Sequence, residues 1–118
     1  MSVKYPLFVF GKDDKSVRLI EKESRILHKL EAIDIENDEY VFWDANGLGV
    51  IVAVAPSSAF RQGRLESVTL APAVFPILDA FKLFAKSIGY PEAVSDGEPM
   101  DVWRSIQAGM EHSPKKRC

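Results

Sequence analysis

The stretch "YVFWDANGLGVIVAVA", residues 40–55, decides the fold because it holds two apolar β-type runs on either side of a turn signal. Asn46-Gly47 lies between the two runs, and both residue types tolerate the positive φ angles that a two-residue type I′ turn requires. The pattern predicts an antiparallel hairpin with strands over Tyr40–Ala45 and Leu48–Ala55. The rest of the chain is expected to build a sheet around this hairpin.

Three further strands are predicted on either side of the hairpin. The apolar run in "YPLFVFG" predicts a strand over Pro6–Phe10, and "SVRLIE", residues 16–21, predicts its return strand after the turn "KDDK". Pro56 ends the second hairpin strand. "LESVTLA", residues 65–71, then predicts a fifth and more polar strand.

Three helices complete the prediction. Apolar residues at helical spacing between Ile26 and Ile33 predict a helix over about Lys22–Ala32, which "DIENDE" ends. "PAVFPILDAFKLFAKSIGYP", residues 72–91, carries an apolar stripe. Because Pro76 is tolerated only in a first turn, this helix is expected to start near Val74, and Gly89 is expected to end it. "MDVWRSIQAGME", residues 100–111, predicts the last helix.

The resulting order, β-β-α-β-β-β-α-α, predicts a single α+β domain over residues 1–112, with a mainly antiparallel sheet of about five strands and three helices. Residues 113–118 are expected to form a flexible basic tail. Several strands are apolar on both faces, whereas a sheet with one solvated face should alternate. Either helices cover both faces, or another molecule covers one of them, as in a homodimer formed through an apolar sheet face.

Composition excludes several classes of protein. The chain has 118 residues, a length that supports one core without metals or disulfides, and Cys118 is its only cysteine. The apolar run near the N-terminus is too short for a signal peptide or a membrane span, so a cytoplasmic protein without membrane contact is expected. The net charge of −2 opposes nucleic-acid binding.

Charge is unevenly distributed along the chain. Residues 30–60 carry six acids and no Lys, Arg or His, for a net charge of −6, while residues 1–29 carry +3 and residues 61–118 carry +1. The densest part lacks the glycine and glutamate spacing of a calcium loop and has no His or Cys for zinc. Acids bunched in a solvated loop share similar environments, which disfavours paired-carboxylate catalysis. We therefore predict no metal, no cofactor and no enzymatic activity, and the acids are either a solvated connector or a partner-binding surface.

The partner-binding hypothesis assigns the acids to long-range attraction and the neighbouring aromatic residues to desolvated anchoring. It predicts a non-enzymatic module that binds a basic protein. In size, acidity and lack of catalytic residues the chain is similar to small acidic enzyme inhibitors, including bacterial immunity proteins. The residues assigned to the partner-binding surface are Asp34, Glu36, Asp38, Glu39, Tyr40, Phe42 and Trp43.

The alternative hypothesis is a small-ligand domain or minor enzyme. Arg61 and Arg64 in "FRQGR" would hold an anionic group. The pocket would lie between sheet and helices and be lined by Phe75, Phe81, Phe84 and Trp103. Neither His28 and His112 nor Ser57 and Ser58 belong to a catalytic motif, and the serines are expected in a turn.

Overall fold

A computed structural model describes residues 2–55, 64–89, 94 and 97–112, with side chains described as far as residue 109. This part of the chain confirms the predicted α+β class. Its strands are β1 (Leu7–Gly11), β2 (Val17–Ile20), β3 (Tyr40–Trp43), β4 (Gly49–Ala55) and β5 (Arg64–Leu70). Its helices are η1 (Glu23–Arg25), α1 (Ile26–Lys29), α2 (Ala32–Glu36), α3 (Ile77–Ser87) and α4 (Pro99–His112).

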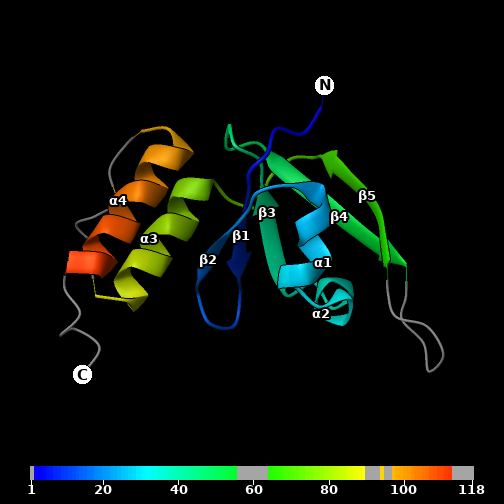
Figure 1. Ribbon diagram of the computed structural model, residues 1–118, viewed down its shortest axis with the longest axis horizontal. Helices are drawn as coiled ribbons and strands as arrows, with labels where there is room; N and C mark the ends of the chain where they lie inside the picture. The colour runs from blue at the N-terminus through cyan, green and yellow to red at the C-terminus, as the bar shows by residue number, and fades with distance from the viewer. Residues whose placement is uncertain (1, 56–63, 90–93, 95–96, 113–118) are drawn as a thin grey trace.

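The five strands form one antiparallel sheet in the order β2-β1-β3-β4-β5. The hairpin of β1 and β2 lies beside the hairpin of β3 and β4, and β2 and β5 form the two outer edges (Figure 1). None of the helices within the described ranges is long and apolar enough to cross a membrane.

The turn between β3 and β4 differs from the predicted type I′ turn. Asp44 N–H donates to the Leu48 oxygen at 2.8 Å, Gly47 N–H donates to the Asp44 oxygen at 2.9 Å, and of the loop residues only Gly47 has a positive φ, of 83°. This is a three-residue loop that ends in a left-handed glycine. The buried Asp44 carboxylate sets it by accepting the N–H groups of Asn46 at 2.9 Å and Leu48 at 3.0 Å.

Helices cover both faces of the sheet at β1 and β3, which explains why these two strands are apolar on both sides. On one face, β1 and β3 present Phe8, Phe10, Val41 and Trp43 to α3 and α4. On the other face, β1, β3 and β4 present Leu7, Val9, Phe42, Val50 and Val52 to α1 and α2. Figure 1 shows the two helical layers on opposite sides of the strands.

The helix predicted over 22–32 is interrupted, and the expectation that "DIENDE" ends it is wrong. Leu30 and Glu31 have extended ψ angles of 145° and 138°, and α2 then begins and includes Asp34 and Glu36. In a continuous helix, nine residues of separation would put Ile26 and Ile35 on opposite sides. The interruption allows both side chains to pack into the same hydrophobic cluster.

Helix α3 begins at Ile77 rather than near Val74. Pro76 has a ψ of 147°, so its backbone is extended, and the residue before a proline is also driven away from the helical region. Residues 71–76 therefore form an extended connector between β5 and α3. The connector passes so close to β4 that a Cβ atom on Gly49 would overlap the Ala71 oxygen and lie 2.7 Å from the Ala73 nitrogen.

A β-bulge interrupts the pairing of β4 with β5. Ala53 lies opposite Ser67 and Val54 lies opposite Leu65, so Glu66 is the extra residue on β5. Strand β5 pairs with β4 alone, and its other edge is an outer edge of the sheet.

Candidate functional site

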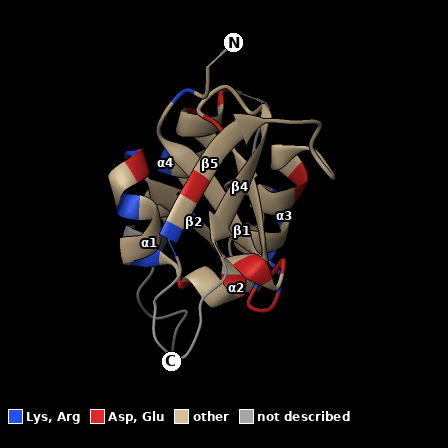
Figure 2. Cartoon of the chain, turned by 90° about the vertical axis from the view of Figure 1, so that its right-hand side faces the viewer, with Lys and Arg blue, Asp and Glu red and all other residues tan. Residues whose placement is uncertain are grey.

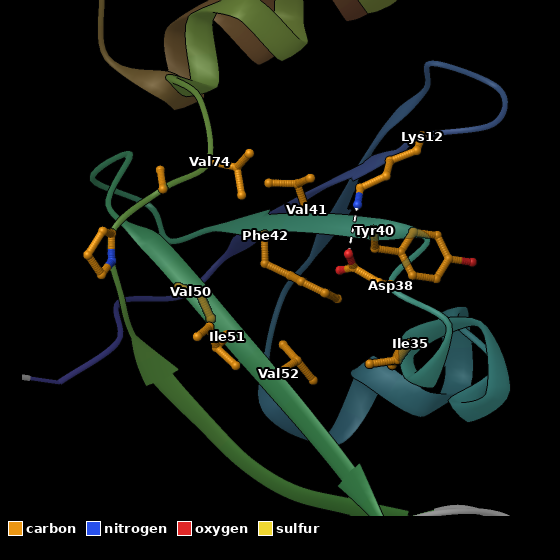
Figure 3. A pocket seen from close by; sticks show the side chains of 12 residues that line it. Lys12, Ile35, Asp38, Tyr40, Val41, Phe42, Val50, Ile51, Val52 and Val74 are labelled. Atoms are coloured by element: carbon orange, nitrogen blue, oxygen red, sulfur yellow. Dashed lines mark hydrogen bonds and ion pairs between the residues drawn. The ribbon is translucent and has the colours of Figure 1, made fainter.

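The sheet opens between its two central hairpin strands. β3 and β4 pair only at Phe42–Val50 and Trp43–Gly49, whereas β4 and β5 pair at six positions. Beyond Phe42 the two strands diverge, as Figure 3 shows. A cavity of about 270 Å³ lies in this opening, and we call it the β3–β4 cleft. Its lining residues are Lys12, Ile35, Asp38, Tyr40, Val41, Phe42, Val50, Ile51, Val52, Pro72, Ala73 and Val74.

The cleft has a buried apolar floor and an exposed apolar rim. Val41 and Phe42 of β3 and Val50 and Val52 of β4 are buried. At the rim, Ile51 is 57% exposed and Val74 of the connector is 82% exposed. These two exposed apolar side chains border the buried floor of the cleft.

The mouth of the cleft is polar. Lys12 Nζ lies 3.1 Å from Asp38 Oδ2, and the side chains of the pair are 42% and 86% exposed. The Tyr40 ring lies beside this pair (Figure 3). An exposed ion pair of this kind contributes about 1 kcal/mol or less. A second cation can therefore replace Lys12 at little cost.

Asp38 occupies a backbone conformation that favours glycine. Its φ is 59°, and it directly follows the C-cap residue Asn37 of α2. Asp38 N–H donates to the Ile35 oxygen and Glu39 N–H donates to the Asp34 oxygen, each at 3.1 Å. This is the Schellman arrangement, in which glycine is the usual left-handed residue. A carboxylate therefore stands at a strained position at the mouth of the cleft.

Further acids gather beside the cleft, on α2, at the start of β3 and in the β1–β2 turn. Figure 2 shows acidic residues on and next to α2. Lys12 N–H donates to the Glu39 oxygen at 3.0 Å, which holds that turn against β3. Partial burial, and then the carboxylates of Asp34 and Asp13, raise the pKa of Glu39. We call Asp13, Asp34, Glu36, Asp38 and Glu39 the acidic patch.

The structure brings together most of the residues that the sequence assigned to a partner-binding surface. Asp34, Glu36, Asp38 and Glu39 belong to the acidic patch, while Tyr40 and Phe42 line the cleft. Trp43 does not join them. It lies on the face of the sheet opposite to Phe42 and has 0% exposure. Its indole N–H donates to the Phe75 oxygen at 3.1 Å.

Most of the residues that line the cleft were not predicted from the sequence, among them Lys12, Val74 and Ile51. Lys12 comes from another hairpin, Val74 comes from the connector, and Ile51 reads as an ordinary strand residue. Only the tertiary fold brings them to one opening. Val74 was assigned to the start of a helix, so no local pattern marked it as part of a surface.

The structure adds little support to the alternative hypothesis of a small-ligand domain. Arg61, Ser57 and Ser58 fall outside the described residues, and Arg64 is exposed at the start of β5. Phe81 packs edge-on against Phe8, and Phe84 stacks on Trp103 with ring centroids 6.3 Å apart, so these rings pack against one another.

The remaining candidate residues lie apart from one another in the described part of the chain. His28 is exposed on α1. No three His, Cys, Asp or Glu side chains within the described ranges converge to hold a metal ion. The candidate site is the cleft with its acidic patch, which combines residues from several elements.

Comparisons with known proteins found no match for the chain, so the site is interpreted from its geometry. No family model, no curated protein and no solved structure matches the chain.

Proposed function

We propose that this protein is a non-enzymatic binding module that engages a basic protein partner through the acidic patch and the β3–β4 cleft. The observation that supports the proposal is the apolar floor of the cleft lying directly beside the acids, with Asp38 at its mouth. An inhibitor or immunity-type protein, which masks a basic surface of an enzyme, is the class of function that this surface suits.

The two parts of the site would act at different stages of binding. The acids of the patch attract a basic surface over distances up to the Debye length, about 10 Å at 0.1 M salt, and so raise the association rate. The apolar floor would then accept a side chain from the partner, and burial of that side chain slows dissociation. At about 270 Å³ the cleft is smaller than most drug-sized ligand pockets, which start near 300 Å³. Its size favours a protein side chain over a cofactor.

The backbone of Asp38 gives independent support. Residues held in sparsely populated conformations cluster at functional sites, where the strain is retained because the side chain is needed. Glycine would relieve the strain at this position but would remove the carboxylate. The acid at position 38 is therefore better explained by recognition than by folding.

The test compares two variants with the same change in net charge. The patch variant reverses Asp34, Glu36, Asp38 and Glu39 to lysine, and the control variant reverses Glu23, Glu66, Asp79 and Asp101, which are exposed outside the patch. Each protein captures partners from the source-cell lysate at about 0.1 M and about 1 M salt, where the Debye length falls to about 3 Å. The captured partner is then purified and titrated against each variant.

We expect a basic protein to bind wild type and the control variant and to be released at high salt. Its affinity for the patch variant should fall at least about tenfold, which corresponds to about 1.4 kcal/mol. Equal affinity for the patch and control variants would refute the proposal. Circular dichroism of both variants establishes that the comparison is made between folded proteins.

A further inference from the structure

We infer that the basic partner enters the β3–β4 cleft as an extended segment, and that its main chain pairs with the edge of β4 that β3 leaves open. The inference rests on the proposed function and specifies how the partner is recognised. Three observations carry it: the direction of the main-chain groups, the early end of the pairing, and the charge around the opening.

The hydrogen bonds on either side of the opening fix which main-chain groups face it. Lys12 N–H bonds to the Glu39 oxygen, so the main-chain N–H and C=O groups of every second residue from position 39 point toward β1. The main-chain groups of Tyr40 and Phe42 therefore point toward β4. Ala71 N–H bonds to the Gly49 oxygen, so alternate residues of β4 from position 49 face β5. Val50, Val52 and Val54 therefore direct their N–H and C=O groups toward β3.

The pairing of β3 with β4 ends before it reaches these groups. Phe42–Val50 is paired, but Tyr40–Val52, the next pair that would exchange hydrogen bonds in the same register, is not. Main-chain donors and acceptors are nearly always paired when they leave water. Since β4 continues to Ala55 whereas β3 begins at Tyr40, the longer open edge belongs to β4, at Val52 and Val54.

The apolar cleft and the acidic patch beside this edge determine which residue types the bound segment should carry. In an extended segment successive side chains point to opposite faces, so apolar residues can fill the cleft while the residues between them face the acidic patch. The patch holds five carboxylates, of which Asp38 pairs with Lys12, while partial burial and then Asp34 and Asp13 raise the pKa of Glu39. The complementary segment alternates apolar residues with Lys or Arg.

The same charge argument disfavours a second copy of the chain as the occupant. A second copy presents its own acidic patch and has a net charge of −2. Its strand β4, which could pair along the open edge, is "GVIVAVA" and carries no basic residue. A basic segment from a different protein satisfies both the edge and the patch.

The probe for the test is a synthetic peptide of about eight residues that alternates Lys and Val, acetylated and amidated at its ends, because a typical strand has about this length. Two matched control peptides carry N-methyl groups, one on every Lys amide and the other on every Val amide. Both keep the charge and the side chains of the parent. Binding is followed by the exchange of individual main-chain amides of the protein with deuterium.

Pairing along one edge predicts an asymmetric result. In the free protein the Val52 amide should exchange faster than the paired Val50 amide, and saturation with the parent peptide should slow Val52 at least tenfold. Methylation of one alternate set of amides should abolish binding. Methylation of the other set should leave the affinity within a few-fold of that of the parent peptide. The inference is overturned if the parent peptide does not bind, if both methylated peptides bind like the parent, or if both fail to bind.

The intact partner separates this inference from the proposed function. If the captured partner discriminates between the patch and control variants but leaves Val52 exchange unchanged, the proposed function stands and main-chain pairing is wrong. If the partner does not discriminate between the two variants, the proposed function itself fails. Slowed exchange at Val52 in the complex, together with discrimination, supports both.

Discussion

The indole N–H of Trp43 donates a 3.1 Å hydrogen bond to the main-chain oxygen of Phe75, and the two rings lie 5.4 Å apart at an interplanar angle of 71°. This contact joins β3 to the connector, whose Pro72, Ala73 and Val74 form one wall of the cleft. A core residue thus positions one wall of the cleft, although it does not line the cleft itself.

Replacement of Trp43 by phenylalanine should destabilise the protein. The change keeps an aromatic ring but leaves the Phe75 oxygen without its donor, and an unpaired group of this kind costs about 1–3 kcal/mol. Urea denaturation measures the loss. A Phe75→Leu variant keeps the acceptor while removing the ring contact, so it separates the two contributions. If Trp43→Phe is as stable as wild type, the hydrogen bond does not hold the connector.

Replacement of Gly49 by alanine should push the connector away from β4. The added Cβ would overlap the Ala71 oxygen and lie 2.7 Å from the Ala73 nitrogen, and overpacking against backbone typically costs about 1–3 kcal/mol. Gly97→Ala is the matched control, because nothing lies within 4 Å of its added Cβ, and it should stay within about 0.5 kcal/mol of wild type. Thermal or urea unfolding distinguishes them, and equal stabilities would contradict the close approach.

The strands were predictable from sequence because their signals are local. Alternation, β-branched runs and the glycine-containing turn indicate β3 and β4 whatever lies around them. The turn type was wrong because a buried aspartate, Asp44, redirects the loop through its side chain. The start of α3 was wrong because Pro76 was assigned to the first turn of the helix, whereas it precedes that turn.

Asp38 variants should change stability and binding in opposite directions. Asp38→Gly relieves a φ of 59° and should raise the free energy of unfolding by up to about 1 kcal/mol, while it weakens partner binding by removing the carboxylate. Asp38→Asn tolerates the same φ but loses the charge, so it should weaken binding with little change in stability. Urea unfolding and titration of the captured partner give the two values. Unimpaired binding by both variants would remove Asp38 from the site.

Replacement of Lys12 by glutamine should strengthen binding of the basic partner. Lys12 occupies Asp38 at 3.1 Å, and its removal frees the carboxylate and makes the patch more negative. Stability should change by about 1 kcal/mol or less, because the pair is exposed. Titration of the partner at low and high salt is the measurement, and the gain should disappear at high salt. Weaker binding would show that Lys12 is itself a contact.

The crowding of Glu39 predicts a specific dependence of stability on pH. Because partial burial and then Asp34 and Asp13 raise its pKa in the folded state, the folded protein binds more protons than the unfolded chain between the two pKa values. Ionised Glu39 therefore opposes folding, and its penalty should shrink as the pH falls through the raised pKa. Compared with wild type, Glu39→Gln should be more stable at neutral pH and should lose this advantage in acid, as measured by urea unfolding at several pH values. An advantage that persists in acid would contradict the shift.

The candidate site was only partly predictable, and Trp43 shows why. Trp43 follows the acids closely in sequence, but adjacent strand residues point to opposite faces, so Phe42 and Trp43 pack into different hydrophobic clusters. Phe42 also lines the cleft, and Trp43 does not. Choosing between the two faces requires knowledge of where the helices pack. The cleft was beyond prediction altogether, because it depends on where the pairing of β3 with β4 ends, and no residue pattern marks that point.

The bulge at Glu66 has a consequence for how this sheet can grow. A strand from another molecule that added to the outer edge along Ser67–Leu70 would lose register on reaching the extra residue, where it would also meet a charged side chain. Bulges and edge charges are the devices by which natural sheets resist edge-to-edge aggregation. The protein thus blunts the β5 edge of the sheet. The edge it leaves open lies inside the sheet, where only a segment of matching charge is expected to enter.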